Sequence, residues 1–165
     1  MNTIRTRLPA WVGAVALVSV AAGARAAEFP KSGEAEYVRY QVARIVGTVT
    51  TPLGKGIVFE DTSITRNVKG EGPFDGLVDR CLGQFTVVGE DWTRGFGTCA
   101  KHDKDGDTML VTWEGDNWKI VSGTGKYKGI TGTGTTITDP AKDLLEDRPD
   151  GWIGTLRHTV KWKID

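Results

Sequence analysis

Residue types that commonly build catalytic and metal sites are scarce in this sequence. Its 165 residues include only two cysteines and two histidines, and His102 and His158 form no His-x-His pattern of the kind that favours zinc or copper. There is no Gly-x-Ser-x-Gly nucleophile elbow, and Gly123-x-Gly125 lacks the next glycine and the strand–helix setting of a dinucleotide site. No block of basic residues stands out, which argues against nucleic acid as a partner. We therefore expect no metal and no cofactor, and no motif names a reaction.

The longest apolar run lies at the N-terminus and has the pattern of a secretory signal peptide. Arg5 and Arg7 supply the positive region, residues 8–22 are almost continuously apolar, and Ala24-Arg25-Ala26 matches a signal-peptidase site. The run is short for a bilayer span. We therefore predict cleavage after Ala26 and one exported domain, residues 27–165, periplasmic or secreted and without a membrane anchor. Because the leader removes three of the 21 basic residues and none of the 21 acidic ones, this domain has a formal charge of −3.

Short runs of β-branched residues between glycine-rich turns indicate an all-β fold. The clearest strands run from Glu36 to Thr50, from Gly56 to Arg66 and from Trp152 to Ile164. Seven or eight such strands with almost no helical periodicity are typical of an antiparallel barrel or sandwich. We favour a barrel of about eight strands, because closure removes exposed edges. Asp139-Pro140 resembles a helix N-cap and first turn, which predicts one short helix or excursion near residues 139–150.

The two cysteines fall opposite each other if the strands around them pair as a hairpin. Centring the loop on Glu90 opposes Val88 to Trp92 and, further along, Cys81 to Cys99. Directly opposed residues of antiparallel strands have Cβ atoms close enough for a disulfide. The spacing is not the Cys-x-x-Cys of a redox site. We therefore predict a structural disulfide, formed in an oxidising compartment.

Glycine is densest between Ile120 and Thr138, at positions 123, 125, 129, 132 and 134. The threonines and isoleucines around these glycines predict a strand, a tight turn carrying Tyr127, and a returning strand. The segment GTGKYKGITGTGT, with its Gly-x-Gly-x-Tyr-x-Gly core, resembles the glycine-rich segment of the allene oxide cyclase and dirigent-like barrel superfamily, especially its small exported bacterial members. This resemblance implies an eight-stranded barrel with a central apolar cavity. It transfers no reaction and no site residue.

His158 is the candidate site residue with the most specific setting. On the last strand, one set of alternate residues from Trp152 to Ile164 is apolar apart from His158, which predicts that this face points into the core. A lone imidazole in an apolar cavity can act as an acid, a base or a hydrogen-bonding group for a ligand. The alternative is a core histidine satisfied by a polar neighbour. We keep His158 as the candidate catalytic and ligand-binding residue.

Aromatic residues supply the other candidate ligand contacts. Trp113 and Trp162 could contact a ligand together with His158, whereas core filling is the simpler explanation for tryptophans in a small barrel. Tyr127 could reach a cavity mouth or pack as a plug over the barrel end.

An acidic stretch imitates a calcium-binding loop. Asp103, Asp105, Asp107 and Glu114 fall at ligand-like spacings. Glycine stands at the fourth loop position rather than the sixth, and no helix is expected on either side. We therefore predict no calcium site here.

Together these features favour a protein that binds a small apolar or aromatic molecule in the barrel interior. A cyclase or isomerase acting in the same cavity is the first alternative, since shape and one polar group can suffice for such catalysis. A structural or interaction protein with a filled barrel, alone or as a homo-oligomer, is the second. An open, apolar interior that contains His158 would separate the first two from the third.

Overall fold

The computed structural model describes residues 28–89, 91–137 and 143–165, without the side chains of residues 92–94. The predicted signal peptide and its cleavage site lie outside the described residues. The elements are β1 (Ser32–Thr51), β2 (Gly54–Asn67), β3 (Val78–Val88), β4 (Asp91–His102), β5 (Thr108–Glu114), β6 (Asn117–Gly123), the 3-10 turn η1 (Gly125–Tyr127), β7 (Ile130–Ile137), β8 (Leu144–Arg148) and β9 (Gly151–Ile164). In this part of the chain no helix is long and apolar enough to cross a membrane.

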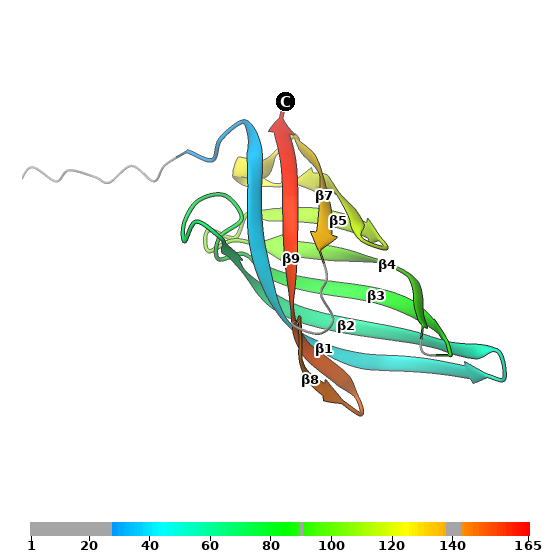
Figure 1. Cartoon of the computed structure of the whole chain (residues 1–165). Coiled ribbons are helices and arrows are strands. Elements are labelled where there is room, and N and C mark those ends of the chain that lie inside the picture. Colours follow the sequence, from blue (N-terminus) through cyan, green and yellow to red (C-terminus); the bar gives the residue numbers. More distant parts are fainter. Residues whose placement is uncertain (1–27, 90, 138–142) are drawn as a thin grey trace, which may run out of the picture.

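Eight of the strands close into an antiparallel barrel, as predicted. From β1 to β7 each strand pairs with the next, β7 pairs with β9, and β9 pairs with β1 to complete the ring. Figure 1 shows β9 running beside β1 across the front of the barrel. The excursion predicted near residues 139–150 is also present. Its described part is a strand, β8, rather than a helix, because Leu144 to Arg148 pair with the first residues of β9.

Cys81 and Cys99 form the predicted disulfide and are directly opposed in the β3–β4 ladder. Close to the turn the predicted register is wrong by one residue, because Val88 pairs with Asp91 rather than with Trp92. A β-bulge further along the ladder absorbs this difference, so the cysteine pairing is unaffected. A disulfide of this kind indicates an oxidising, extracellular type of environment.

One end of the barrel is filled with side chains, and we call it the packed end. The loops from β2 to β3, β4 to β5 and β6 to β7 lie there. Phe74, in the β2–β3 loop, stacks on Tyr37 with ring centroids 5.6 Å apart and meets Trp162 edge-on at 5.2 Å. The buried side chains of this end include Tyr37, Phe74, Leu77, Met109, Tyr127, Ile130, Val160 and Trp162. Their burial supplies much of the hydrophobic stabilisation of a small domain.

The glycine-rich segment forms the predicted strand, turn and returning strand as β6, η1 and β7. Gly125 and Gly129 have φ values of +50° and +82°, a region that side-chain-bearing residues rarely adopt. At position 134 glycine is needed for a different reason, because a Cβ there would overlap the Trp118 indole. The glycines thus permit a tight turn and the close approach of a large ring.

Candidate functional site

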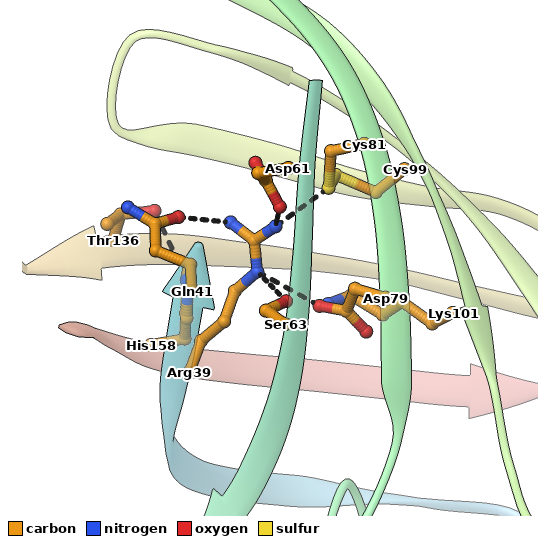
Figure 2. Close-up of a disulfide and its surroundings, with 10 residues drawn as sticks. All are labelled: Arg39, Gln41, Asp61, Ser63, Asp79, Cys81, Cys99, Lys101, Thr136 and His158. Atoms are coloured by element: carbon orange, nitrogen blue, oxygen red, sulfur yellow. Dashed lines mark hydrogen bonds and ion pairs between the residues drawn. A yellow bond between two sulfur atoms is a disulfide. The ribbon is translucent and has the colours of Figure 1, made fainter. Parts of the chain in front are cut away.

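A layer of polar and charged side chains crosses the barrel directly beyond the packed end. Arg39, on β1, lies at its centre (Figure 2). Its guanidinium donates hydrogen bonds to Ser63 Oγ (2.7 Å), Asp79 Oδ2 (3.1 Å), Gln41 Oε1 (3.0 Å), the Asp61 carboxylate and Cys81 Sγ (2.9 Å). These partners come from β1, β2 and β3. One side chain therefore ties three neighbouring strands together from the inside.

Lys101, on β4, extends this layer. Its Nζ donates to Asp79 Oδ2 over 2.5 Å, so one carboxylate pairs with both Lys101 and Arg39. Arg39, Asp61, Asp79 and Lys101 are all at most 6% exposed. Burying charged groups costs several kcal/mol each unless they are paired and hydrogen-bonded, and a purely structural core avoids that cost. Buried ionisable clusters beside a cavity are common at functional sites.

Burial sets the protonation tendencies in this layer. It raises the pKa of Asp61, although Arg39 acts in the opposite direction. It lowers the pKa of Lys101, although Asp79 opposes that shift. It also lowers the pKa of His158 well below its ordinary value, and the Lys101 and Arg39 cations add to the shift. His158 is therefore neutral at pH 7.

His158 faces the barrel interior, as the alternation on β9 predicts. It is 7% exposed, stacks on Tyr37 with centroids 5.0 Å apart, and places Nδ1 3.2 Å from Thr136 Oγ1. Trp118 meets its ring edge-on at 5.8 Å. Among the described residues, neither His158 Nε2 nor Trp118 Nε1 has a hydrogen-bond partner. His158 Nε2 and Trp118 Nε1 are therefore available to form hydrogen bonds with water or with a bound molecule.

Above this layer the barrel encloses a cavity of about 740 Å³. The polar layer forms one wall, which we call the floor and define by the cavity-lining residues Arg39, Gln41, Asp61, Lys101, Trp118 and His158. The β5–β6 turn and β8 contribute Asp116 and Asp147 at the other side, so the cavity faces the end opposite the packed one. We call this the open end.

Aromatic rings line the open end. Phe59 stacks on Phe85 with centroids 5.0 Å apart, and Trp152 lies 5.1 Å from Phe59. Trp113 completes the group at 5.7 Å from Phe85. A Cβ on Gly95 would overlap both Phe85 and Trp113, so the glycine lets these rings lie close against the barrel wall.

The four ligand-contact candidates from the sequence divide between the two ends. Trp113 and His158 line the cavity. Trp162 and Tyr127 lie in the packed end instead: Trp162 Nε1 donates to Pro30 O at 3.0 Å, and the Tyr127 ring meets Phe29 edge-on at 4.9 Å. For these two residues the structure supports core filling and plugging, and it does not bring them to the cavity.

The charged residues of the polar layer were missed at the sequence level, although a usable signal exists for two of them. Asp79 precedes Cys81 by two residues, and Lys101 follows Cys99 by two. Strand side chains alternate between faces, so an inward-facing disulfide places Asp79 and Lys101 inside as well. Arg39 has no comparable signal, because its neighbours Val38 and Tyr40 are the apolar residues of that stretch and yet lie on the outer face. Asp61 stands between Glu60 and Thr62, so polarity does not single it out.

Two aspartates of the stretch that imitates a calcium-binding loop form ion pairs with a lysine. Lys126 Nζ lies 2.6 Å from Asp103 Oδ2 and 2.8 Å from Asp105 Oδ2. In the described part of the chain no group of three or more His, Cys, Asp or Glu side chains is arranged to hold a metal ion.

No protein-family model, curated protein or solved structure matches the chain.

Proposed function

We propose that this protein is exported and binds a small apolar or aromatic molecule in the open half of its barrel. The cavity carries the proposal. Its volume of about 740 Å³ falls within the range of roughly 300–1,000 Å³ common for small-molecule sites. Mostly apolar walls with a few converging polar groups are also the usual composition of such sites. The disulfide supports export, because it forms in oxidising compartments.

The contrast between the two ends supports binding over a filled structural barrel. Aromatic side chains fill the core of the packed end, with Tyr37, Phe74 and Tyr127 at most 2% exposed. At the open end Phe85, Trp113 and Trp152 are only partly buried and surround a space. A barrel that needed only a core would have its rings in that space.

A cyclase or isomerase is the second candidate, and the ionisable groups of the floor favour it. A neutral imidazole at His158 and the Asp61 carboxyl, whose pKa is raised, line the same cavity. Groups with shifted protonation tendencies can pass a proton to and from a bound molecule. Any such reaction needs a ligand held in the cavity, so the binding experiment tests its premise too.

Native mass spectrometry is the direct test of binding. The protein would be expressed with its own N-terminal segment, recovered from the periplasm by osmotic shock, and kept folded throughout. We expect a bound small molecule that denaturation releases, and displacement of that molecule by the apolar probe N-phenyl-1-naphthylamine.

Two β9 variants locate the binding. Leu156 lines the cavity, so Leu156→Trp should narrow it and weaken probe binding, whereas Thr159→Trp on the exposed face should not. Repeated recovery of protein without a bound molecule, together with no probe binding, would overturn the proposal.

A further inference from the structure

The cavity floor presents hydrogen-bond donors without partners in the described part of the chain. The buried acceptor Asp79 Oδ1 also lacks a partner there, but it does not line the cavity. Lys101 has three N–H groups and makes one hydrogen bond within the described chain, to Asp79. Gln41 accepts a hydrogen bond from Arg39 with its amide oxygen, so its NH₂ group is the part of the side chain that can donate to a ligand. Trp118 Nε1 is a further donor without a partner in this part of the chain. A molecule that brings acceptor oxygens would satisfy these groups.

The charged side chains at the floor also favour a ligand that brings acceptor oxygens. Arg39 and Lys101 line the cavity, whereas Asp79, which pairs with both, is fully buried and does not. Asp61 is therefore the one carboxyl of the floor. The other cavity-lining carboxylates, Asp116, Asp143 and Asp147, belong to the mouth and are exposed or half-exposed, where water and salt screen them.

We propose that the ligand is a planar aromatic carboxylate, held with its carboxylate on the floor and its ring system between Phe85, Trp113 and Trp152. This rests on the proposed binding function and names its ligand class. The aromatic walls accept a flat ring by stacking and edge contacts. The carboxylate accepts hydrogen bonds from Lys101, Gln41 and Trp118 without stranding an acceptor of its own.

His158 fits the same ligand. Its Nδ1 lies beside the Thr136 hydroxyl. When that hydroxyl donates to Nδ1, the proton of the neutral ring is on Nε2. A carboxylate selects this tautomer, because Nε2–H then gives it a further donor.

The negative charge of Asp61 repels a bound carboxylate, so a variant of Asp61 tests whether the ligand is negatively charged. The charged groups that act on Asp61 are Arg39, Asp79 and Lys101, and a bound carboxylate adds a second negative charge to the cavity floor. Binding is accordingly expected to draw a proton onto Asp61. Asp61→Asn removes the competing charge and keeps an oxygen that can accept from Arg39. This variant should bind an aromatic carboxylate more tightly than the wild type does.

The experiment compares two probes of one shape, 2-naphthoate and neutral 2-naphthalenemethanol, by titration calorimetry at pH 7. We expect 2-naphthoate to bind at least about tenfold more tightly, since charge-assisted hydrogen bonds are roughly twice as strong as neutral ones. Asp61→Asn should raise the affinity for 2-naphthoate about tenfold, because it removes the negative charge that repels the carboxylate on the floor. It should change the affinity for 2-naphthalenemethanol less than about twofold, because that probe carries no charge. A gain of affinity cannot result from damage to the fold.

A matched pair of tryptophan variants tests the floor donors. Trp118→Phe should reduce the preference for 2-naphthoate. Trp162→Phe, which removes an indole N–H from the packed end, should leave it unchanged, with thermal melting confirming that both variants fold. Equal affinity of the two probes for the wild type would overturn the carboxylate proposal and leave the binding function in place. Absence of binding by either probe, in protein that also carries no bound molecule and does not bind N-phenyl-1-naphthylamine, would overturn both.

Discussion

Arg39 Nη2 donates a hydrogen bond to Cys81 Sγ over 2.9 Å, so the central guanidinium of the charged floor contacts the disulfide. The same guanidinium reaches carboxylates on β2 and β3. The disulfide fastens β3 to β4, and Lys101, the second cation, lies two residues beyond Cys99 on β4. Covalent and ionic links thus meet in one layer of the barrel and hold four strands around the floor.

Removal of the disulfide should destabilise the protein without changing its fold. The half-cystines are 18 residues apart, and the loop-entropy model assigns about 3 kcal/mol to a closed loop of that size. We expect Cys81→Ser with Cys99→Ser to lose about that much free energy of unfolding in urea titrations. Mass spectrometry after alkylation should find no free thiol in the wild type. Two alkylated cysteines in protein recovered without reductant would contradict the prediction.

Replacement of Arg39 should be far more costly than replacement of an exposed arginine. Arg39→Met leaves the Asp61 and Asp79 carboxylates without this partner, and breaking a buried ion pair costs about 3–5 kcal/mol. Arg44 is the matched control on the same strand. Its side chain is 66% exposed where it pairs with Glu60, and exposed pairs contribute less than about 1 kcal/mol. Similar losses for Arg39→Met and Arg44→Met in urea titrations would show that the layer does not stabilise the barrel.

His158 should make the folded state sensitive to acid. Burial lowers the pKa of His158 in the folded protein, so below about pH 6.5, the ordinary histidine value, the unfolded chain binds a proton that the folded chain does not. Stability from this group is therefore present above that pH and falls as the pH drops, by up to about 1.4 kcal/mol per pH unit.

The test compares urea titrations at pH 7 and pH 5. His158→Gln should flatten the loss of stability over this interval, because it removes the proton uptake that favours the unfolded chain. His102→Gln, on β4, is the matched control for the loss of one histidine, and only a flattening specific to His158→Gln supports the assignment. An unchanged pH dependence in His158→Gln would contradict the assignment.

Strand positions and the disulfide could be predicted because their signals are local, and the disulfide also marks Lys101 as inward-facing, whereas Arg39 and Asp61 could not be predicted. Glycine-rich turns mark where strands end, and the opposed cysteines fix one register. On β1 the hydrophobic alternation predicts the wrong inner face, because the apolar residues there point outward and the polar ones point into the barrel. Arg39 is 6% exposed, while its apolar neighbours Tyr40 and Val42 are 48% and 51% exposed. A rule that places apolar residues inside assumes an apolar interior, and this stretch of β1 lines a polar one.

Two glycine variants should differ because of what their Cβ atoms would meet. Gly134→Ala places a methyl group into the Trp118 indole and beside the Thr159 carbonyl. Overpacking of this kind costs roughly 1–3 kcal/mol, and it should also disturb the indole N–H at the floor. Gly47→Ala is the control, since its nearest atom would be Val58 Cβ at 3.8 Å, an ordinary contact. Equal melting temperatures for the two variants would contradict the crowding argument.

Phe74 should separate the stability of the barrel from its binding. Its backbone has φ of +64°, an uncommon conformation for a side-chain-bearing residue, and its ring is 2% exposed in the packed end. Phe74→Ala should cost about 3–5 kcal/mol, as truncation of buried aromatic residues does. Leu53→Ala, in the β1–β2 turn and 86% exposed, should cost almost nothing. Because the charged layer lies between Phe74 and the cavity, folded Phe74→Ala should still bind N-phenyl-1-naphthylamine as the wild type does. Loss of probe binding under conditions where the variant remains folded would show that the two ends are coupled, and that the floor is not the rigid partition its ion pairs suggest.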